Sequence, residues 1–211
     1  MIRKKAIIIS IKGTSLSYKE KLLLSKEKPW GLILFKRNIS SKIQTNNLIK
    51  DIKKNAGERN FPILIDEEGA KVSRLKEIFN LNIDANYFGN LYKINSKIAI
   101  VLYKNYLKSL CTKLKKLGIN INTIPVLDVL RKNTNNIIGT RSYSHKKEIV
   151  KKLGEITIKE CHSRNILTVV KHIPGHGCTN VDSHLKMPKV TISEADLNKI
   201  DFYPFKSTKA K

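Results

Sequence analysis

Short apolar runs alternate along this chain with longer segments in which apolar residues recur every three or four positions. The short runs are rich in β-branched residues and have the length of buried strands. They predict strands at residues 6–11, 31–35, 62–65, 119–127 and 167–171. The longer segments predict amphipathic helices at about residues 18–26, 41–56, 94–117 and 145–164. Strands and helices are therefore expected to alternate.

The longest amphipathic segment has the clearest helical pattern. Its apolar residues fall on one face of a helix: Ile98, Val101, Leu102, Leu110, Leu114 and Leu117. Gly118 follows at once, and glycine is typical of the position after a helix C-terminus. Strands joined through helices of this length pair in parallel. The pattern therefore predicts an α/β fold with a parallel sheet, in one domain over residues 1–211.

Polar residues follow several of the predicted strands. Asp66 comes after the third strand, Asp128 ends the fourth, and Lys171 and His172 end the fifth. The ends of parallel strands lie at one edge of the sheet, and in a (β/α)8 barrel that edge carries the chemistry. We therefore expect a functional site there.

Composition sets the class of the protein. With 211 residues, 41% of them hydrophobic, the chain can bury one sizeable core. Its first apolar run, of about six residues, is shorter than the hydrophobic region of a signal peptide, and no segment approaches the roughly 20 apolar residues of a membrane span. The scattered Cys111, Cys161 and Cys178 form neither a disulfide framework nor a paired zinc motif. A cytoplasmic protein without a membrane partner is expected.

A formal net charge of +24 would ordinarily indicate a nucleic acid or an anionic surface as the partner. Here Lys greatly outnumbers Arg, and Ile and Asn are over-used as well, which favours a genome rich in A and T as the cause. Base readout would need arginine, and stacking on bases would need aromatic residues among the basic ones. We expect no specific nucleic-acid partner; a basic nucleic-acid-binding protein remains the weakest alternative, and any polyanion binding should be weak and salt-sensitive.

The most informative stretch is Lys171-His172-Ile173-Pro174-Gly175-His176-Gly177, followed by Asp182-Ser183-His184. Its glycines allow the backbone to approach a ligand. Asp182 stands two residues before His184, close enough for the carboxylate to orient the imidazole and fix its tautomer. By itself such a pair is more often a loop histidine beside a solvated aspartate.

This stretch resembles the KH-x-PGHG-x-T-x-x-DSH signature of the β-N-acetylglucosaminidases of glycoside hydrolase family three, of the peptidoglycan-recycling type. Other segments resemble motifs of that family in the same order: residues 31–38 its second-strand motif, residues 64–74 its IDQEGG-x-V-x-R motif, residues 125–129 its APVLDV motif and residues 138–143 its IG-x-RS-[FY] motif. The resemblance covers the whole chain.

The resemblance implies a (β/α)8 TIM-barrel fold, of which this chain would hold about five of eight units. It implies hydrolysis of terminal β-linked N-acetylglucosamine from muropeptide fragments, with no cofactor and no metal. His184 would be the acid/base, supported by Asp182, in place of the usual second carboxylate. Five residues would bind the sugar: Asp66, Arg74, Arg141, Lys171 and His172.

Other interpretations of these residues remain open. Arg74 and Arg141 could be ordinary surface charges, Asp66 could cap a helix, and Asp128 is expected to be structural. A zinc site could use imidazole, thiolate and carboxylate from a set whose spacing matches no standard pattern: His172, His176, Cys178, Asp182 and His184.

The chain departs from the family pattern in two places. Ala70 replaces the second glycine of the EGG turn, which would strain the loop if that position needs a positive φ. The family places its nucleophilic aspartate in an SDDL-type motif after the seventh strand, and no residue up to Lys211 matches that motif. The sequence is thus expected to be an N-terminal portion, active only with a complementing C-terminal polypeptide, with an inactive remnant or a sugar-binding or interaction subunit as the alternative.

Overall fold

The computed structural model describes residues 4–80, 83–206 and 208. Its centre is a five-stranded sheet in the order β1-β2-β3-β4-β5, in which every neighbouring pair is parallel. The strands are β1 (Lys5–Ile9), β2 (Pro29–Leu34), β3 (Ile63–Ile65), β4 (Ile121–Asn122) and β5 (Leu167–Thr168). β1 and β5 are the two edges, so the described residues form an open sheet.

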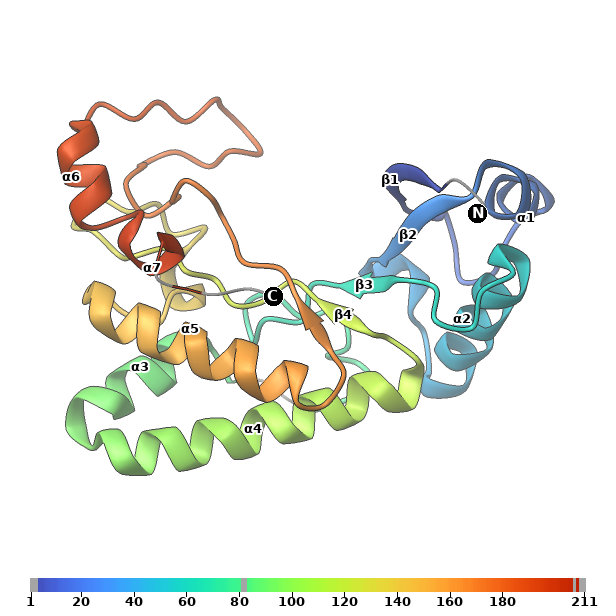
Figure 1. Cartoon of the computed structure of the whole chain (residues 1–211), viewed down its shortest axis with the longest axis horizontal. Coiled ribbons are helices and arrows are strands. Elements are labelled where there is room, and N and C mark those ends of the chain that lie inside the picture. Colours follow the sequence, from blue (N-terminus) through green and yellow to red (C-terminus); the bar gives the residue numbers. More distant parts are fainter. Residues whose placement is uncertain (1–3, 81–82, 207, 209–211) are drawn as a thin grey trace.

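Helices connect these strands. They are α1 (Tyr18–Leu22), α2 (Lys42–Ala56), α3 (Ala85–Ile94), α4 (Ser96–Leu117), α5 (Lys147–His162), α6 (Glu194–Lys199) and α7 (Tyr203–Lys206). A π-helical segment (Leu23–Glu27) extends α1, and 3-10 turns occupy Lys36–Asn38 and Gly139–Arg141. Figure 1 shows α1 and α2 beside β1 and β2, and α3 and α5 toward the other end of the molecule, while α4 runs from that end back to α2.

The helix boundaries follow from local chemistry. The side chain of Ser41 accepts a hydrogen bond from the Gln44 backbone N–H at the start of α2, and Asn95 does the same for Ile98 at the start of α4. Gly118 ends α4 with a φ of 90°, a conformation that costs glycine little and other residues more. The long α4 and its end at Gly118 are therefore as predicted.

The core lies between the sheet and the helices that cover it. β3 is buried along its whole length, at Ile63, Leu64 and Ile65. On the helix side, α4 buries Leu107, Leu110 and Leu114, and α5 buries Leu153 among others. The predicted apolar face of α4 is confirmed in its second half, whereas Ile98, Val101 and Leu102 are exposed.

Several predicted elements need correction, and one helix was missed. The fifth strand covers only Leu167–Thr168 rather than residues 167–171. The fourth strand is much shorter than 119–127, because its chain leaves regular pairing at residue 123 and returns only as a bridge between Val126 and Lys171. The first helix turns into a π-helix after Leu22. The helix α3 was not predicted at all; its Gly89 lies against the backbone of Tyr143, where a Cβ atom would be 1.7 Å from the carbonyl oxygen.

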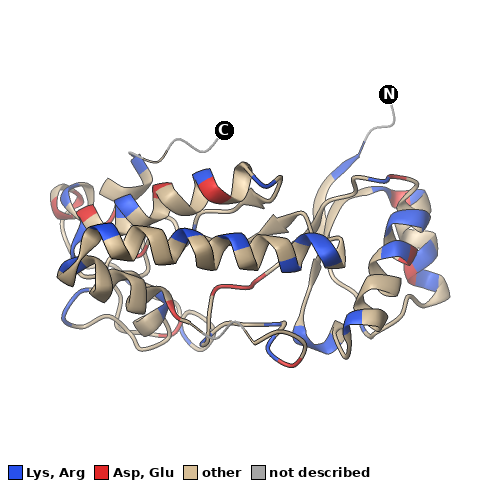
Figure 2. Cartoon of the chain, turned by 90° about the horizontal axis from the view of Figure 1, so that it is seen from below, with Lys and Arg blue, Asp and Glu red and all other residues tan. Residues whose placement is uncertain are grey.

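The basic residues are spread over the structure, as they are along the sequence. Figure 2 shows Lys and Arg along α4 and on helices at both ends of the molecule, with acidic residues among them. Within the described part of the chain, no helix is both long and apolar enough to cross a membrane.

Candidate active site

The polar residues predicted at the strand ends do meet at one place. A cavity of about 460 Å³ opens at the C-terminal edge of the sheet. Its lining includes six of the seven predicted site residues: Asp66, Arg74, Arg141, Lys171, His172 and His184. Asp182, the seventh, does not line the cavity but is hydrogen-bonded to the His184 ring. Glu68, Val72, Ile137, Ile138, His176 and Ser183 complete the lining.

Asp66 is held by three donors. Thr123 Oγ1 donates to its Oδ1 at 2.5 Å, Lys171 Nζ lies 3.4 Å from the same oxygen, and Arg74 Nη2 donates to Oδ2 at 3.1 Å. Burial acts to raise the pKa of Asp66, but the hydrogen bond from Thr123 and the charges of Lys171 and Arg74 outweigh it, so the pKa lies below its ordinary value. Asp66 is therefore an ionised acceptor rather than a helix cap.

Glu68 pairs with two cations of the site, Arg141 and Lys171, and the sequence interpretation missed it. Arg141 donates to its two oxygens from Nε (2.7 Å) and Nη2 (2.9 Å), and Lys171 Nζ lies 2.5 Å from Oε1. The Glu68 and Arg141 side chains are 5% and 9% exposed, so Arg141 is not a surface charge. The signal for Glu68 was its place two residues after Asp66 in the same motif, since alternate residues of an extended chain face the same way.

Asp128 orients His172 through a hydrogen bond to its ring. It is fully buried, and its Oδ2 lies 2.6 Å from His172 Nδ1. Its Oδ1 accepts the backbone N–H of His172 at 3.3 Å and that of His176 at 2.7 Å. On the other side of the ring, His172 Nε2 lies 3.0 Å from Arg141 Nη2. Asp128 thus holds both the imidazole and the loop that carries it.

The Asp182–His184 pair forms as the spacing predicts. Asp182 Oδ1 lies 2.8 Å from His184 Nδ1 and also accepts the His184 backbone N–H at 2.9 Å. These two hydrogen bonds lower the pKa of Asp182. The His184 side chain is 77% exposed, so its other nitrogen, Nε2, remains accessible. A carboxylate that fixes one imidazole nitrogen leaves the other to give or take a proton.

Glu67 supports the loop behind the site. Its buried carboxylate accepts from Ser73 Oγ at 2.6 Å and from the backbone N–H groups of Arg74 (2.8 Å) and Leu75 (3.0 Å). Burial raises the pKa of Glu67 despite these hydrogen bonds. Ala70, in the same loop, is not among the residues with positive φ, so the strain expected there is absent.

A zinc site finds no support in this geometry. Nowhere in residues 4–80, 83–206 and 208 do three or more His, Cys, Asp or Glu side chains gather as metal ligands would. The Cys178 thiol donates to the Gly175 carbonyl at 3.2 Å, and burial raises the pKa of that thiol, which leaves it a poor nucleophile.

Known proteins are similar to this chain over most of its length. Residues 2–210 match the Glycosyl hydrolase family 3 N terminal domain. A beta-hexosaminidase from Haemophilus ducreyi is 35% identical over 205 residues, which cover 97% of this chain and 58% of that protein. Beta-hexosaminidase A from Pseudoalteromonas piscicida is 33% identical over 195 residues, covering 87% of this chain and 31% of that protein.

Solved structures give the same picture. The crystal structure of native NagZ from Neisseria gonorrhoeae superimposes with a TM-score of 0.89 at 30% identity, covering 96% of this chain and 58% of that one. The chain thus spans well under two thirds of the length of these relatives. Together with the open five-stranded sheet, these matches confirm the predicted fold, an incomplete (β/α)8 barrel of the TIM type.

Proposed function

The chain belongs to glycosyl hydrolase family 3, and from that premise we propose that it supplies the sugar-binding and acid/base parts of a β-N-acetylhexosaminidase. The reaction is removal of terminal, non-reducing β-linked N-acetylglucosamine from peptidoglycan fragments. Residues 1–211 act in this proposal as one portion of the family's N-terminal domain. The observation that carries the proposal is the cavity at the strand ends, where the predicted sugar-binding residues and an accessible imidazole meet.

The cavity offers a sugar both acceptors and donors. The ionised Asp66 can accept from hydroxyl groups, while Lys171 and Arg74 can donate to hydroxyls or to the acetamido carbonyl. Arg74 Nε is buried without a hydrogen-bond partner in the described part of the protein, as is His176 Nε2. Polar groups left unpaired in this way favour a polar ligand, because a ligand hydroxyl would satisfy them.

His184 provides the proton transfers. Its accessible nitrogen gives a proton to the leaving glycosidic oxygen and afterwards takes one from the attacking water. Asp182, ionised and hydrogen-bonded at 2.8 Å, stabilises the imidazolium that exists before the first transfer and after the second. The high exposure of His184 supports this role, since the substrate must reach it.

Retention of configuration also needs a carboxylate nucleophile. The carboxylates that line the cavity are Asp66 and Glu68, and both are already occupied by cationic donors. One oxygen of each accepts from two donors, and the other is paired with an arginine, which weakens both carboxylates as nucleophiles for attack on a sugar carbon. We therefore assign the nucleophile to residues outside 1–211, within a complementing C-terminal polypeptide.

A cytoplasmic location fits this proposal. All three cysteines are free, and the Sγ atoms of Cys111 and Cys161 lie 3.7 Å apart in the core without a bond. A reducing compartment keeps such a pair as thiols. The second candidate function is a sugar-binding or interaction subunit without catalysis, favoured by the exposed apolar residues at both edges of the sheet, Ile7 in β1 and Leu167 in β5.

The test measures binding and turnover separately. Calorimetry on the isolated chain should detect N-acetylglucosamine and show much weaker binding of glucose, which lacks the acetamido group. The chain alone should not hydrolyse a chromogenic β-N-acetylglucosaminide, whereas addition of the C-terminal remainder of a related hexosaminidase should restore turnover. Turnover without an added polypeptide would refute the assignment of the nucleophile. Binding without restored turnover would favour the non-catalytic subunit, and absence of binding would refute the site.

A further inference from the structure

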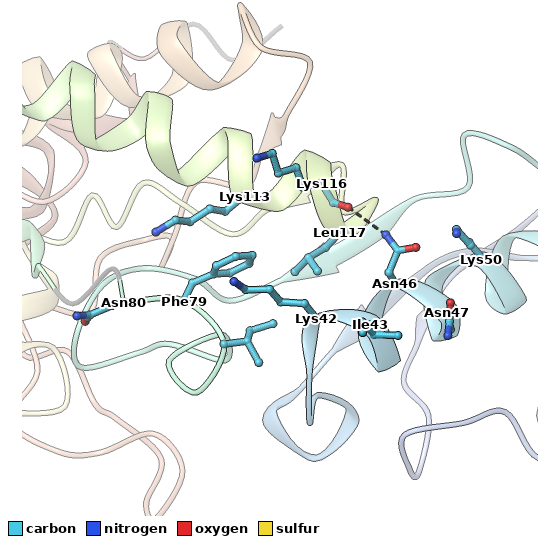
Figure 3. Close-up of a pocket in the computed structure, with 11 residues that line it drawn as sticks. Lys42, Ile43, Asn46, Asn47, Lys50, Phe79, Asn80, Lys113, Lys116 and Leu117 are labelled. Carbon is cyan, nitrogen blue, oxygen red and sulfur yellow. Dashed lines mark hydrogen bonds between the residues drawn. The ribbon is translucent and has the colours of Figure 1, made fainter.

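A second, larger pocket lies away from the candidate active site. It has a volume of about 740 Å³ and opens between the first half of α2, the segment 78–80 and the C-terminal end of α4 (Figure 3). Its lining residues are Lys42, Ile43, Asn46, Asn47, Lys50, Ile78, Phe79, Asn80, Lys113, Lys116 and Leu117. None of them lines the active-site cavity, so the two sites are separate.

The lining carries four positive charges and no negative one. Lys42, Lys50, Lys113 and Lys116 contribute the charges, and no Asp or Glu lines the pocket. Among the described residues these four ammonium groups form no ion pair, whereas nearby Lys36 pairs with Glu77 at 3.1 Å and Lys21 pairs with Asp51 at 3.2 Å. Uncompensated like charges at a concave surface raise the local potential and attract anions.

The ring of Phe79 contacts two of these ammonium groups. Lys42 Nζ lies 4.9 Å and Lys113 Nζ 5.3 Å from the centre of its ring, within the range of a cation–π contact. Phe79 itself packs against the hydrophobic core, so its ring is a fixed support. Figure 3 shows Lys116 at the same end of the pocket, while Lys50 lies toward the opposite end. The cationic end is thus organised before any ligand arrives.

The remainder of the lining suits an organic group. Leu117 is buried at the base, and Ile43, at the rim, is 77% exposed. Asn46 Nδ2 donates to the Lys116 carbonyl at 3.0 Å, which ties α2 to the end of α4 (Figure 3). The pocket therefore has an anchored wall, an apolar surface and a charged end.

We propose that this pocket binds a small organic phosphate of the nucleoside diphosphate class. Several lysine ammonium groups at one end match a multiply charged anion, and lysine is a common partner of phosphate. A single carboxylate would neutralise only one of the charges. The volume is that of a small-molecule site, and one pocket of this size does not provide the extended track that a nucleic-acid strand requires.

The experiment titrates ADP, inorganic pyrophosphate, adenosine and a single-stranded oligonucleotide into the full chain by calorimetry at constant ionic strength. The test variant is Lys42→Gln with Lys113→Gln. The control is Lys97→Gln with Lys108→Gln, which removes the same charge from exposed positions of α4 outside the pocket. A third variant, Phe79→Leu, keeps an apolar side chain and removes the ring. Thermal unfolding of each variant without ligand verifies that it folds.

ADP should bind more tightly than pyrophosphate, and adenosine should bind least. The pocket variant should weaken ADP binding by at least about tenfold, and the control by much less. Phe79→Leu should weaken both ADP and pyrophosphate, because the two ammonium groups lose their common support. Equal losses in the pocket and control variants would overturn the proposal in favour of general charge attraction. Tighter binding of the oligonucleotide than of ADP would overturn it in favour of a nucleic-acid surface.

Discussion

Arg141 Nη2 lies 3.0 Å from His172 Nε2, and this contact determines which nitrogen of His172 carries the proton. A guanidinium group can only donate, so Nε2 must accept. The proton therefore sits on Nδ1, which donates to Asp128 Oδ2 at 2.6 Å. A neutral His172 in this tautomer completes a chain from the buried Asp128 to the cavity, and Arg141 keeps further donors for Glu68.

Asp128→Asn should disturb this chain. The amide keeps the shape of the carboxylate but replaces one oxygen with an NH₂ group. That group faces either the His172 ring, which now donates to Oδ2, or the two backbone N–H groups that now donate to Oδ1. If that group faces His172, the imidazole must shift its proton to Nε2, where it meets the Arg141 donor. A donor left unpaired costs about 1–3 kcal/mol, so N-acetylglucosamine binding should weaken about tenfold or more.

Nitrogen NMR of the His172 ring and calorimetry measure these two effects. The control is Asp51→Asn, which removes a partly exposed carboxylate of α2 that pairs with Lys21 and accepts a hydrogen bond from Asn55, away from the cavity. An unchanged Nδ1–H tautomer together with unchanged sugar binding would show that Asp128 does not position His172.

Glu67→Gln should change how stability depends on pH. In the folded protein, burial raises the pKa of Glu67 above its unfolded value. A proton is therefore held more tightly in the folded state, and ionisation opposes folding. Relative to the glutamine variant, the wild type should be most stable at pH values below the ordinary pKa of glutamate. It should lose that stability as pH rises through the pKa of Glu67 in the folded protein. Glutamine is also the residue in the family motif IDQEGG that this segment resembles.

Denaturant unfolding of both proteins between pH 4 and pH 7 measures the difference. As pH rises, the free energy of unfolding of the wild type should fall relative to that of the variant, because only the wild type has a carboxylate to ionise at position 67. A difference that moves the other way would mean that the hydrogen bonds from Ser73, Arg74 and Leu75 outweigh burial.

His184→Ala should remove the proposed acid/base and leave the proposed sugar-binding residues in place. In the chain supplemented with the C-terminal part of a related hexosaminidase, turnover of a β-N-acetylglucosaminide should fall about a hundredfold or more. Substrates with activated aryl leaving groups should lose less, since they need less help from an acid. Binding of N-acetylglucosamine should stay within about twofold, because such a surface side chain contributes little to affinity. Asp182→Asn should show the same pattern with a smaller loss of turnover.

A smaller loss of turnover on the activated aryl substrate than on the ordinary β-N-acetylglucosaminide would distinguish an acid/base role of His184 from a structural one. A folding defect would lower turnover of both substrates by the same factor. A variant with wild-type turnover on both would remove His184 from the mechanism.

Sequence and structure differ at particular residues for physical reasons. Motif residues such as Asp66 and Lys171 could be placed because strand ends share one edge of a parallel sheet. The pairing of donors with acceptors could not be predicted, because contacts such as that of Thr123 with Asp66 form only between neighbouring strands. Helix α3 escaped prediction because Gly89, which lowers helix propensity, is needed for its contact with Tyr143. Phe79 lies in a loop without periodicity, so nothing local indicated that it would gather lysines from two helices.

Gly177→Ala should displace the loop that joins His172 to His184. A Cβ atom at position 177 would lie 1.9 Å from the Val129 carbonyl oxygen, a backbone atom that cannot turn aside as a side chain could. The loop must therefore move away from the residues after β4, which weakens the contacts of His172 and His176 with Asp128. Overpacking of this kind costs about 1–3 kcal/mol.

Thermal unfolding and N-acetylglucosamine binding, measured on the same preparation, test this change. Gly13→Ala is the matched control, because a Cβ atom there meets nothing within 4 Å. The control should leave both quantities unchanged, whereas Gly177→Ala should lower both, since one loop carries the contact to Asp128 and the cavity wall. If Gly177→Ala behaved like Gly13→Ala, the loop would not be held against Val129, and the cavity could not depend on that close approach.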